Sequence, residues 1–267
     1  MYLAIDIGGT KTLVAAVEDN GVIARSQKFP TPLEYKKFLK QLEENLKALG
    51  EHSWKGAGVG VPAVVNYADG SVPRLANLPW KEVTLQADLH ELLGCRVRVE
   101  NDANLAGLSE AMLVKDQFQK VLYVTVSTGI GGGYIVNQRI SADLADLEPG
   151  HMLLQHEGKL QEWEVFASGR AIYQKYGQYA HDIYDTTAWR EITENIGCGL
   201  IILEAVIQPD VIIIGGSIGT YFERYADYLT AYLQEHNTTV VPARPVRSAQ
   251  RPEQAVVYGC YDLASQK

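Results

Sequence analysis

The sequence lacks the features that mark secreted, membrane and nucleic-acid-binding proteins. It has only 3 cysteines in 267 residues (Cys95, Cys198 and Cys260), and their spacing fits neither a disulfide framework nor a metal cluster. No apolar run reaches the roughly 18 residues of a membrane-spanning helix, and the opening residues have the pattern of a strand rather than a signal peptide. The net charge is −8 without a long basic run, which argues against a nucleic-acid surface. We therefore expect a cytoplasmic protein with no nucleic-acid or membrane partner.

Two common nucleotide-binding motifs are also missing. There is no G-x-x-x-x-G-K-[ST] sequence, and hence no Walker A loop. The glycine-rich run 129–133 is followed by Tyr134, and the glycines of 215–219 have the wrong spacing, so neither matches G-x-G-x-x-G. Any nucleotide site must therefore be of another kind.

The most informative segment that is present is the first dozen residues. An apolar strand over residues 3–7 contains Asp6 and leads into Gly8-Gly9-Thr10-Lys11-Thr12, and a second apolar strand follows at once. A glycine-rich turn lets backbone N–H groups approach an anion closely, and Thr10 and Lys11 add a hydroxyl and an ammonium. Asp6 is placed where a metal-bound phosphate could be held. The alternative is an ordinary hairpin with a Gly-Gly turn.

Along the rest of the chain, predicted strands alternate with predicted helices, which indicates an α/β fold. Thr31-Pro32-Leu33-Glu34 predicts a helix start with Thr31 as N-cap, and Gly50 predicts the end of that helix. We expect further helices over residues 84–93, 103–112, 168–176, 187–207 and 220–235, and strands over residues 56–62, 96–99, 121–126 and 211–214.

A second strand–glycine–strand unit echoes the first. The strand over 121–126 leads into Ser127-Thr128-Gly129-Ile130-Gly131-Gly132-Gly133. Two such hairpins indicate two domains with one hairpin each. We expect an N-terminal α/β domain over residues 1–110, with the last helix (about 252–265) as a candidate to pack back on it, and a larger C-terminal α/β domain over residues 111–267.

Asn101-Asp102 is the strongest candidate for catalytic chemistry. The pair lies at the end of a predicted strand, where a helix begins. Phosphoryl transfer to an alcohol needs a carboxylate that accepts the hydroxyl proton and groups that hold the nucleophile in line. The alternative is that Asp102 only caps the following helix.

Together these segments resemble the sugar-kinase-like ROK family (repressors, open reading frames, kinases) of the actin-like ATPase superfamily. Residues 6–11 resemble its first phosphate loop, and Val99 to Asn104 matches its catalytic segment, Val-Glu-Asn-Asp-Ala-Asn. The resemblance implies two actin-like (ribonuclease H-like) α/β domains with an ATP and sugar cleft between them. It also implies that Asp102 is the general base and that Asn101 binds the sugar.

The resemblance further implies a site for Mg-ATP. Residues 127–133 look like the second phosphate loop of the family, and residues 209–218 resemble its adenosine segment. Asp6 is the implied Mg²⁺ ligand, directly or through water. The implied ATP-binding residues are Asp6, Gly8, Gly9, Thr10, Lys11, Thr12, Ser127, Thr128, Gly129, Gly131, Gly132, Gly215 and Gly216.

Three more segments imply contacts to a sugar. Residues 148–152 resemble the family's Glu-x-Gly-His-Met segment, residues 77–80 resemble Asn-Leu-Pro-x-Trp, and residues 164–169 match Glu-x-Tyr-Ala-Ser-Gly with Phe166 in place of Tyr. Carboxylates and imidazole suit this role because each sugar hydroxyl needs a directional partner. The implied sugar-binding residues are Asn77, Asn101, Asp102, Glu148, His151 and Glu164, with Ser168 as a helix cap.

The segment that follows His151 departs from the family pattern. Typical members have three cysteines there, which bind zinc together with the histidine; here those positions are Gln155, Glu157 and Glu162. One histidine with hard carboxylates is a poor structural zinc site. We therefore expect no zinc, and we expect Trp163 and Phe166 to stabilise the segment by packing.

The resemblance implies an ATP-dependent kinase of a hexose or hexose derivative, with the 6-hydroxyl as the family norm. Glucokinase, fructokinase, N-acetylmannosamine kinase and β-glucoside kinase activities all remain open, and a homodimer is the family expectation. The alternatives are a sugar-sensing regulator and a non-catalytic sugar-binding protein. Regulators of the family carry a helix-turn-helix ahead of the first phosphate loop, whereas this sequence opens at that loop.

Overall fold

The computed structural model describes residues 1–50, 53–75 and 77–266, and its contacts divide the chain into two compact units. The first unit comprises Met1–Ser109 and Glu253–Lys267, and the second comprises Glu110–Pro252. That the units are separate folding domains stays a prediction. Among the described helices, none combines the length and the apolar character that crossing a membrane requires.

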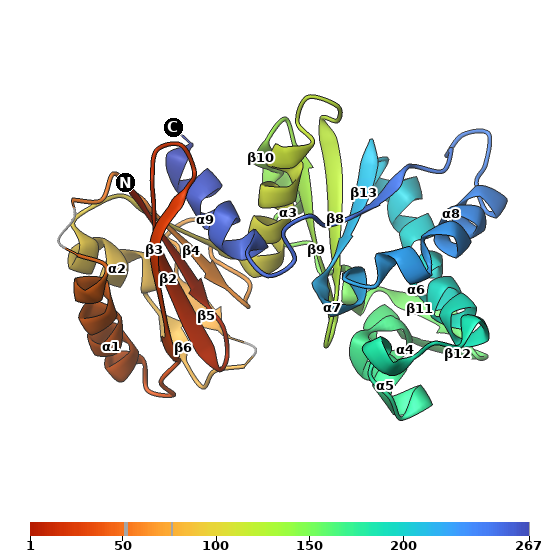
Figure 1. Cartoon of the computed structure of the whole chain (residues 1–267), viewed down its shortest axis with the longest axis horizontal. Helices are drawn as coiled ribbons and strands as arrows, with labels where there is room; N and C mark the ends of the chain where they lie inside the picture. Colours follow the sequence, from red (N-terminus) through yellow and green to blue (C-terminus); the bar gives the residue numbers. More distant parts are fainter. Residues whose placement is uncertain (51–52, 76, 267) are drawn as a thin grey trace. The chain divides into compact units, whose positions relative to one another are not determined.

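The first unit is built on a mixed sheet with the strand order β3-β2-β1-β4-β7 (Figure 1). A small β5-β6 pair is separate from this sheet. The elements of the unit are β1 (Tyr2–Ile7), β2 (Lys11–Val17), β3 (Ile23–Pro30), α1 (Tyr35–Ala48), β4 (Ala57–Val61), β5 (Val72–Arg74), β6 (Lys81–Val83), α2 (Leu85–Leu93), β7 (Val97–Asn101), the first part of α3 (Asp102–Leu113) and α9 (Ala255–Ser265).

The register of this sheet brings the candidate carboxylates to the carboxyl ends of its parallel strands. Strands β1, β4 and β7 are parallel, and Asp6 pairs with Gly60, which in turn pairs with Glu100. Because neighbouring strands lie about 4.8 Å apart, the Cα atoms of Asp6 and Glu100 are about 10 Å apart. Asp6 and the Asn101-Asp102 pair therefore lie at the carboxyl ends of strands of the same sheet.

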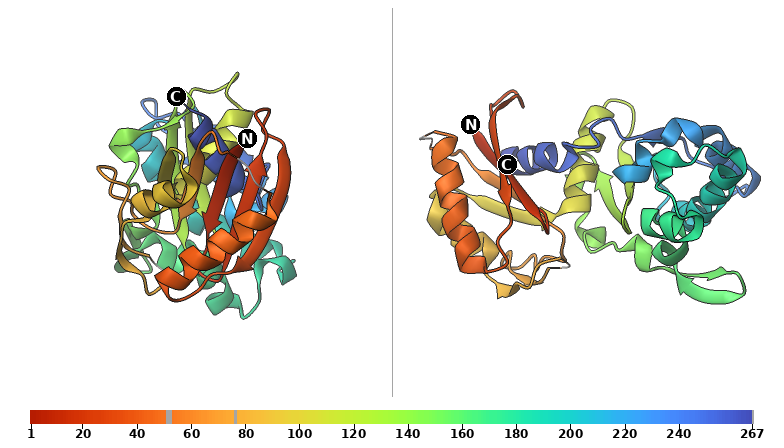
Figure 2. Two further views of the ribbon diagram at one scale, coloured as in Figure 1. Left: turned by 90° about the vertical axis from the view of Figure 1, so that its left-hand side faces the viewer. Right: turned by 60° about the horizontal axis from the view of Figure 1, so that its bottom comes forward.

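Helix α1 begins later than the sequence predicts. Its N-cap is Glu34, so the prediction that Thr31 caps the helix is wrong. The Thr31 hydroxyl instead donates to the Gly8 carbonyl oxygen at 2.8 Å and lies 2.9 Å from the Thr12 hydroxyl. The helix buries Phe38 and Leu42 in the core, and it lies across a face of the sheet (Figure 2, left).

The second unit has the strand order β10-β9-β8-β13-β14, in which β8 pairs with β9 antiparallel and with β13 parallel. Its elements are β8 (Lys120–Val126), β9 (Ile130–Val136), β10 (Arg139–Ile140), η1 (Ala142–Leu144), η2 (Pro149–His151), β11 (Leu153–His156), β12 (Lys159–Glu162), α4 (Trp163–Ala167), α5 (Gly169–Tyr176), η3 (Ala180–Asp182), α6 (Thr186–Ile207), β13 (Val211–Gly215), α7 (Gly216–Gly219), η4 (Phe222–Arg224), α8 (Ala226–Glu235) and β14 (Val246–Ser248).

Two predicted boundaries in this unit differ from the structure. The glycine-rich segment after β8 is shorter as a loop, because β9 begins at Ile130 and pairs it with Val126. The helix predicted over 220–235 is divided into η4 and α8. Tyr225, between the two, is 1% exposed and stacks on Trp189, so this residue is fixed by the core rather than by helical periodicity.

Helix α9 packs closely against the sheet of the first unit. A Cβ atom on Gly58, in β4, would lie 2.0 Å from the Cys260 carbonyl oxygen. A Cβ atom on Gly259 would lie 2.0 Å from the Leu105 carbonyl oxygen of α3. The C-terminal helix therefore contacts both β4 and α3 with backbone against backbone, which only glycine permits.

This close packing gives a stability prediction. Gly58→Ala forces the backbone of α9 away from β4, and we expect it to lower the free energy of unfolding by about 2–3 kcal/mol. Gly177→Ala is the control: nothing lies within 4 Å of an added Cβ, and only the left-handed backbone costs about 1 kcal/mol. Urea denaturation of both variants makes the measurement. Equal losses would contradict a close α9–β4 contact.

Candidate functional site

The first phosphate-loop candidate is a tight turn between β1 and β2. The Gly8 N–H donates to the Lys11 carbonyl oxygen at 3.0 Å, so Gly9 and Thr10 form the tip. A Cβ atom on Gly9 would lie 2.5 Å from Cβ of Asn77. The tip therefore needs glycine because the loop that carries Asn77 presses on it.

Supporting contacts hold this turn from behind. Trp80 is buried and its Nε1–H donates to the Leu33 carbonyl oxygen at 3.0 Å, which anchors the loop that carries Asn77. Thr12 is fully buried with its hydroxyl beside that of Thr31, so it supports the turn from the core. Thr10 and Lys11 are exposed. Sequence reasoning missed Thr31 because its Thr-Pro-x-Glu setting is also typical of a helix start.

Asp6 is a largely buried carboxylate. Burial raises its pKa from 3.8 to about 6, and the positive charge of Lys28 opposes this shift. A cation would stabilise the charged form of such a group. The structure thus offers a carboxylate oxygen at the carboxyl end of β1 that suits Mg²⁺, which prefers oxygen ligands.

Glu100 organises the segment around Asp102. It is 5% exposed, and its Oε1 accepts hydrogen bonds from the Tyr67 hydroxyl (2.7 Å), the Asn101 backbone N–H (2.8 Å) and the Asn104 side-chain amide (3.0 Å). Burial raises the pKa of Glu100, and these three donors oppose the shift. Because one buried carboxylate accepts from all three groups, the end of β7 and the start of α3 are held in one conformation.

Asn101 caps α3. Its Oδ1 accepts from the backbone N–H of Ala103 at 2.8 Å and of Asn104 at 3.3 Å, while its amide donates to the Ala63 carbonyl oxygen at 3.2 Å. The capping that an alternative interpretation gives to Asp102 is thus supplied by its neighbour. The Asn101 amide keeps a second N–H for a ligand.

In the second unit, the Ser127 loop lies beside the turn that follows β13. The hydroxyl oxygens of Ser127 and Ser217 are 3.4 Å apart, and the Gly169 N–H donates to the Ser127 carbonyl oxygen at 2.6 Å. Gly216 has a φ of +75°, and a Cβ atom there would lie 2.5 Å from the Val126 carbonyl oxygen. Only glycine meets both constraints, and it brings the two loops together.

A cavity of about 300 Å³ opens between these loops and the helices beside them. It is lined by Ser127, Thr128, Gly169, Arg170, Tyr173, Tyr179, Ala180, His181, Ser217, Ile218 and Tyr221. Tyr179 is 60% exposed and packs on Tyr173 at 4.6 Å between ring centroids. These aromatic residues sit too far apart in sequence for a motif to identify them, since the fold alone brings residues 170–181 next to residue 217.

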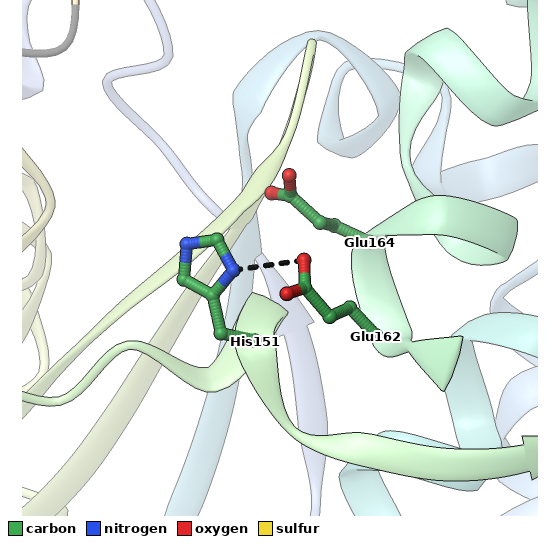
Figure 3. A group of neighbouring side chains, drawn as sticks. All are labelled: His151, Glu162 and Glu164. Carbon is green, nitrogen blue, oxygen red and sulfur yellow. Dashed lines mark hydrogen bonds and ion pairs between the residues drawn. The ribbon is translucent and has the colours of Figure 1, made fainter. Parts of the chain in front are cut away.

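The second cluster of candidates contains Glu148, His151 and Glu164, with Glu162 beside them. His151 Nδ1 lies 3.0 Å from Glu162 Oε2, and the Glu164 carboxylate points toward the same imidazole (Figure 3). Glu162 raises the pKa of His151, as do Glu164 and Glu148, while desolvation lowers it. Partial burial raises the pKa of Glu148, and Glu164 adds to the shift.

Glu164 also contacts the second phosphate-loop candidate. Its Oε2 accepts from the Ile130 N–H at 3.1 Å and lies 2.4 Å from where a Cβ atom on Gly129 would be. The same oxygen lies 3.1 Å from an added Cβ on Gly150. One carboxylate thus joins the start of β9 to the Glu-x-Gly-His-Met segment. The expected cap is confirmed as well, since Ser168 Oγ accepts from the Ala171 N–H at 3.3 Å.

The segment that departs from the family pattern forms a β-hairpin, β11–β12, which extends from the rest of its unit (Figure 2, right). Glu157 and Gly158 make its turn, both with positive φ, as in a type I′ turn. Trp163 is fully buried and donates to the Asn195 carbonyl oxygen at 2.8 Å, and the Phe166 ring stacks on His156 at 4.1 Å. The expected packing of Trp163 and Phe166 is confirmed.

The donors near His151 do not fit a structural zinc. Within residues 1–50, 53–75 and 77–266, one candidate metal group is found, and its ligand atoms, from His151, Glu162 and Glu164, lie within 4.8 Å of one another. It offers one imidazole, two hard carboxylates and no thiolate, whereas structural zinc takes mostly thiolates and imidazoles. The absence of zinc stays a prediction.

Comparison with known proteins decides the family. The model of the ROK family matches residues 2–267. The chain belongs to the ROK family. A glucokinase of Streptomyces coelicolor is 25% identical over 99% of this chain and 97% of its own length, and an N-acetyl-D-glucosamine kinase of Haemophilus influenzae is 27% identical over 98% and 99%. The structure of a ROK family glucokinase from Streptomyces griseus with glucose and AMPPNP superposes with a TM-score of 0.80 at 24% identity, covering 100% and 99% of the two chains.

Membership of the ROK family confirms two predictions from the sequence, the family and the α/β actin-like fold. The roles of individual residues stay predictions. The family match spans the β11–β12 hairpin as well, so a chain without the zinc-binding cysteines keeps the fold of its relatives.

The burial of Asp6 gives a prediction for stability against pH. Its folded pKa of about 6 lies above the ordinary 3.8, so ionisation costs stability as pH rises through this window, and the penalty is complete above it. We expect Asp6→Asn to raise the free energy of unfolding by about 2–3 kcal/mol at pH 8, and by about 1 kcal/mol less at pH 5. Urea denaturation at both pH values makes the measurement, and a gain independent of pH would contradict the raised pKa.

Proposed function

We propose that this ROK protein is an ATP-dependent kinase of a hexose or hexose derivative. The observation that carries the proposal is the junction of β7 and α3, where Glu100 and the Asn101 cap fix the backbone that bears Asp102. The start of a helix does not require a buried carboxylate with three donors. Such a network suits a site in which the Asp102 carboxylate must meet a hydroxyl in one geometry. The sugar-kinase names of the relatives support the same reaction.

Asp102 acts as the general base in this proposal. The acceptor hydroxyl, the 6-hydroxyl by family norm, attacks the γ-phosphorus of ATP, its proton passes to the Asp102 carboxylate, and ADP leaves. Phosphoryl transfer needs positioning and charge neutralisation more than covalent help from the protein. Lys11 and the backbone N–H groups of the Gly9-Thr10 tip supply positive charge for the phosphates, and Asp6 holds Mg²⁺, directly or through water.

The cavity beside Ser127 and Ser217 takes the nucleoside of ATP in this proposal. Its volume of about 300 Å³ and its aromatic lining suit a purine, which stacks on aromatic rings. Gly216 leaves bare backbone for the ribose. Ser127 and Thr128 line the same cavity and place hydroxyls for the phosphates.

The sugar is bound in the proposal by Glu148, His151 and Glu164, together with Asn77 and Asn101. Carboxylates accept hydrogen bonds from sugar hydroxyls, and an imidazole nitrogen can donate or accept. Glu164 also accepts a hydrogen bond from the Ile130 N–H at the start of β9. In the proposal, this one side chain therefore contacts both the bound sugar and the second phosphate loop.

Replacement of the base gives the sharpest mutational prediction. Asp102→Asn removes the proton acceptor and keeps the side-chain size, so we expect kcat to fall by about 10²–10⁴-fold with the sugar Kd changed less than about threefold. Asp116→Asn, a change of the same charge at an exposed position, is the control and should keep full activity. Steady-state rates and calorimetric sugar binding make the measurement. An unchanged kcat would rule out Asp102 as the base.

The substrate is found by measuring ADP release from Mg-ATP across a panel of sugars. We expect a sugar-dependent rate with one of glucose, fructose, mannose, N-acetylmannosamine, N-acetylglucosamine, allose or cellobiose. Sugar binding without ADP release would instead favour the sensor or binding-protein alternatives. The same panel run with polyphosphate in place of ATP tests the phosphate donor.

A further inference from the structure

His151 and Glu162 form a pair at two positions that the family pattern gives to a zinc-binding histidine and a zinc-binding cysteine. Glu162 is the last residue of β12 and falls on one of the three positions that are cysteine in typical members. Its Oε2 lies 3.0 Å from His151 Nδ1 (Figure 3). A carboxylate thus meets the imidazole at Nδ1.

We propose that Glu162 is a positioning residue that replaces the metal: it accepts the Nδ1–H of His151 and so leaves Nε2 as the atom that meets a sugar hydroxyl. This inference rests on the proposed function. A neutral imidazole has one donor and one acceptor nitrogen, and a partner on one nitrogen decides what the other can do. Carboxylates play this role for metal-binding histidines by fixing the tautomer and the ring orientation.

The backbone holds both partners in place. The Trp163 N–H donates to the Met152 carbonyl oxygen at 2.9 Å, which joins the residue after Glu162 to the residue after His151. The Trp163 ring is fully buried, and a Cβ atom on Gly199 of α6 would lie 2.2 Å from it. The backbone at Glu162 is therefore held in place, although the side chain of Glu162 lies at the surface.

The pair is too exposed to serve stability. The side chains of His151 and Glu162 are 58% and 44% exposed, and exposed ion pairs contribute about 0–1 kcal/mol to folding. Three carboxylates face the imidazole, from Glu162 on β12, Glu164 on α4 and Glu148 before η2, and Glu164 already accepts from the Ile130 N–H. Glu162 is the one at hydrogen-bond distance from Nδ1. Orientation of the ring is therefore the role that fits the geometry.

The kinetic test compares three variants with the sugar chosen by the panel. We expect Glu162→Ala to raise the sugar KM tenfold or more, with the ATP KM and the unfolding midpoint unchanged. Glu162→Gln should restore most of the affinity, because its carbonyl oxygen can still accept the Nδ1–H. Glu157→Gln is the matched control: it removes the same charge from the same hairpin, at a side chain that is 74% exposed, and should change nothing. Equal effects of Glu157→Gln and Glu162→Ala would overturn the proposal.

The tautomer of His151 provides a test that needs no sugar. Above the pKa of the imidazole, ¹⁵N NMR of the intact protein should show His151 with Nδ1–H, and in Glu162→Ala it should show the Nε2–H form that free imidazole prefers. His151→Gln assigns the signal. The same tautomer in both proteins overturns the proposal even if the protein is a kinase. A changed tautomer without phosphorylation or binding of any sugar supports the pair but overturns its role toward a sugar, and there the proposed function fails separately.

A metal at the same three side chains is the competing outcome. Turnover is measured with 1,10-phenanthroline and Mg²⁺ in excess, then with added Zn²⁺ or Mn²⁺. We expect turnover to stay unchanged, because Glu162 already accepts the hydrogen bond of His151 Nδ1, the nitrogen that a metal at this site would bind. Loss of activity with the chelator and its return with Zn²⁺ or Mn²⁺ would overturn the proposal in favour of a metal centre.

Discussion

The parallel alignment of β1, β4 and β7 is the constraint on which the candidate chemistry of the first unit depends. Asp6, Gly60 and Glu100 lie opposite one another on three parallel strands. The segments that follow β1 and β7 therefore leave the sheet at the same end, where the strands have their carboxyl ends. The turn after β1 and the Asp102 helix after β7 are therefore neighbours by register. A slip of one residue in the β1–β4 pairing alone would turn the Asp6 side chain to the opposite face of the sheet from Glu100.

The glycines around these strands are explained by contact more than by backbone freedom. Gly9 meets Asn77, and Gly58 meets the backbone of α9; neither has a positive φ. Each lets a neighbouring segment approach to a distance that a Cβ atom would forbid. The same is true of Gly199, which receives the Trp163 ring and so fixes the start of α4. At these three positions, glycine is therefore required by close packing.

The sequence predicted the fold class and the family because seven separate segments carry motifs whose residues are adjacent in the chain. It failed where the deciding contact was distant. Thr31 lies in a sequence typical of a helix cap, yet its hydroxyl donates a hydrogen bond to the carbonyl oxygen of Gly8, 23 residues away. Tyr173 and Tyr179 belong to no sequence motif, yet they line a cavity with Ser217. The Glu162 contact with His151 needed the hairpin geometry, which a comparison of cysteine positions does not contain.

The carboxylates near His151 differ in the contacts that balance them. Glu148, Glu162 and Glu164 repel one another, and each would be more stable with a donor. Glu162 has the imidazole, and Glu164 has the Ile130 amide, whereas partial burial raises the pKa of Glu148. Sugar hydroxyls are donors without charge, so they satisfy such acceptors without the desolvation cost that a cation would add.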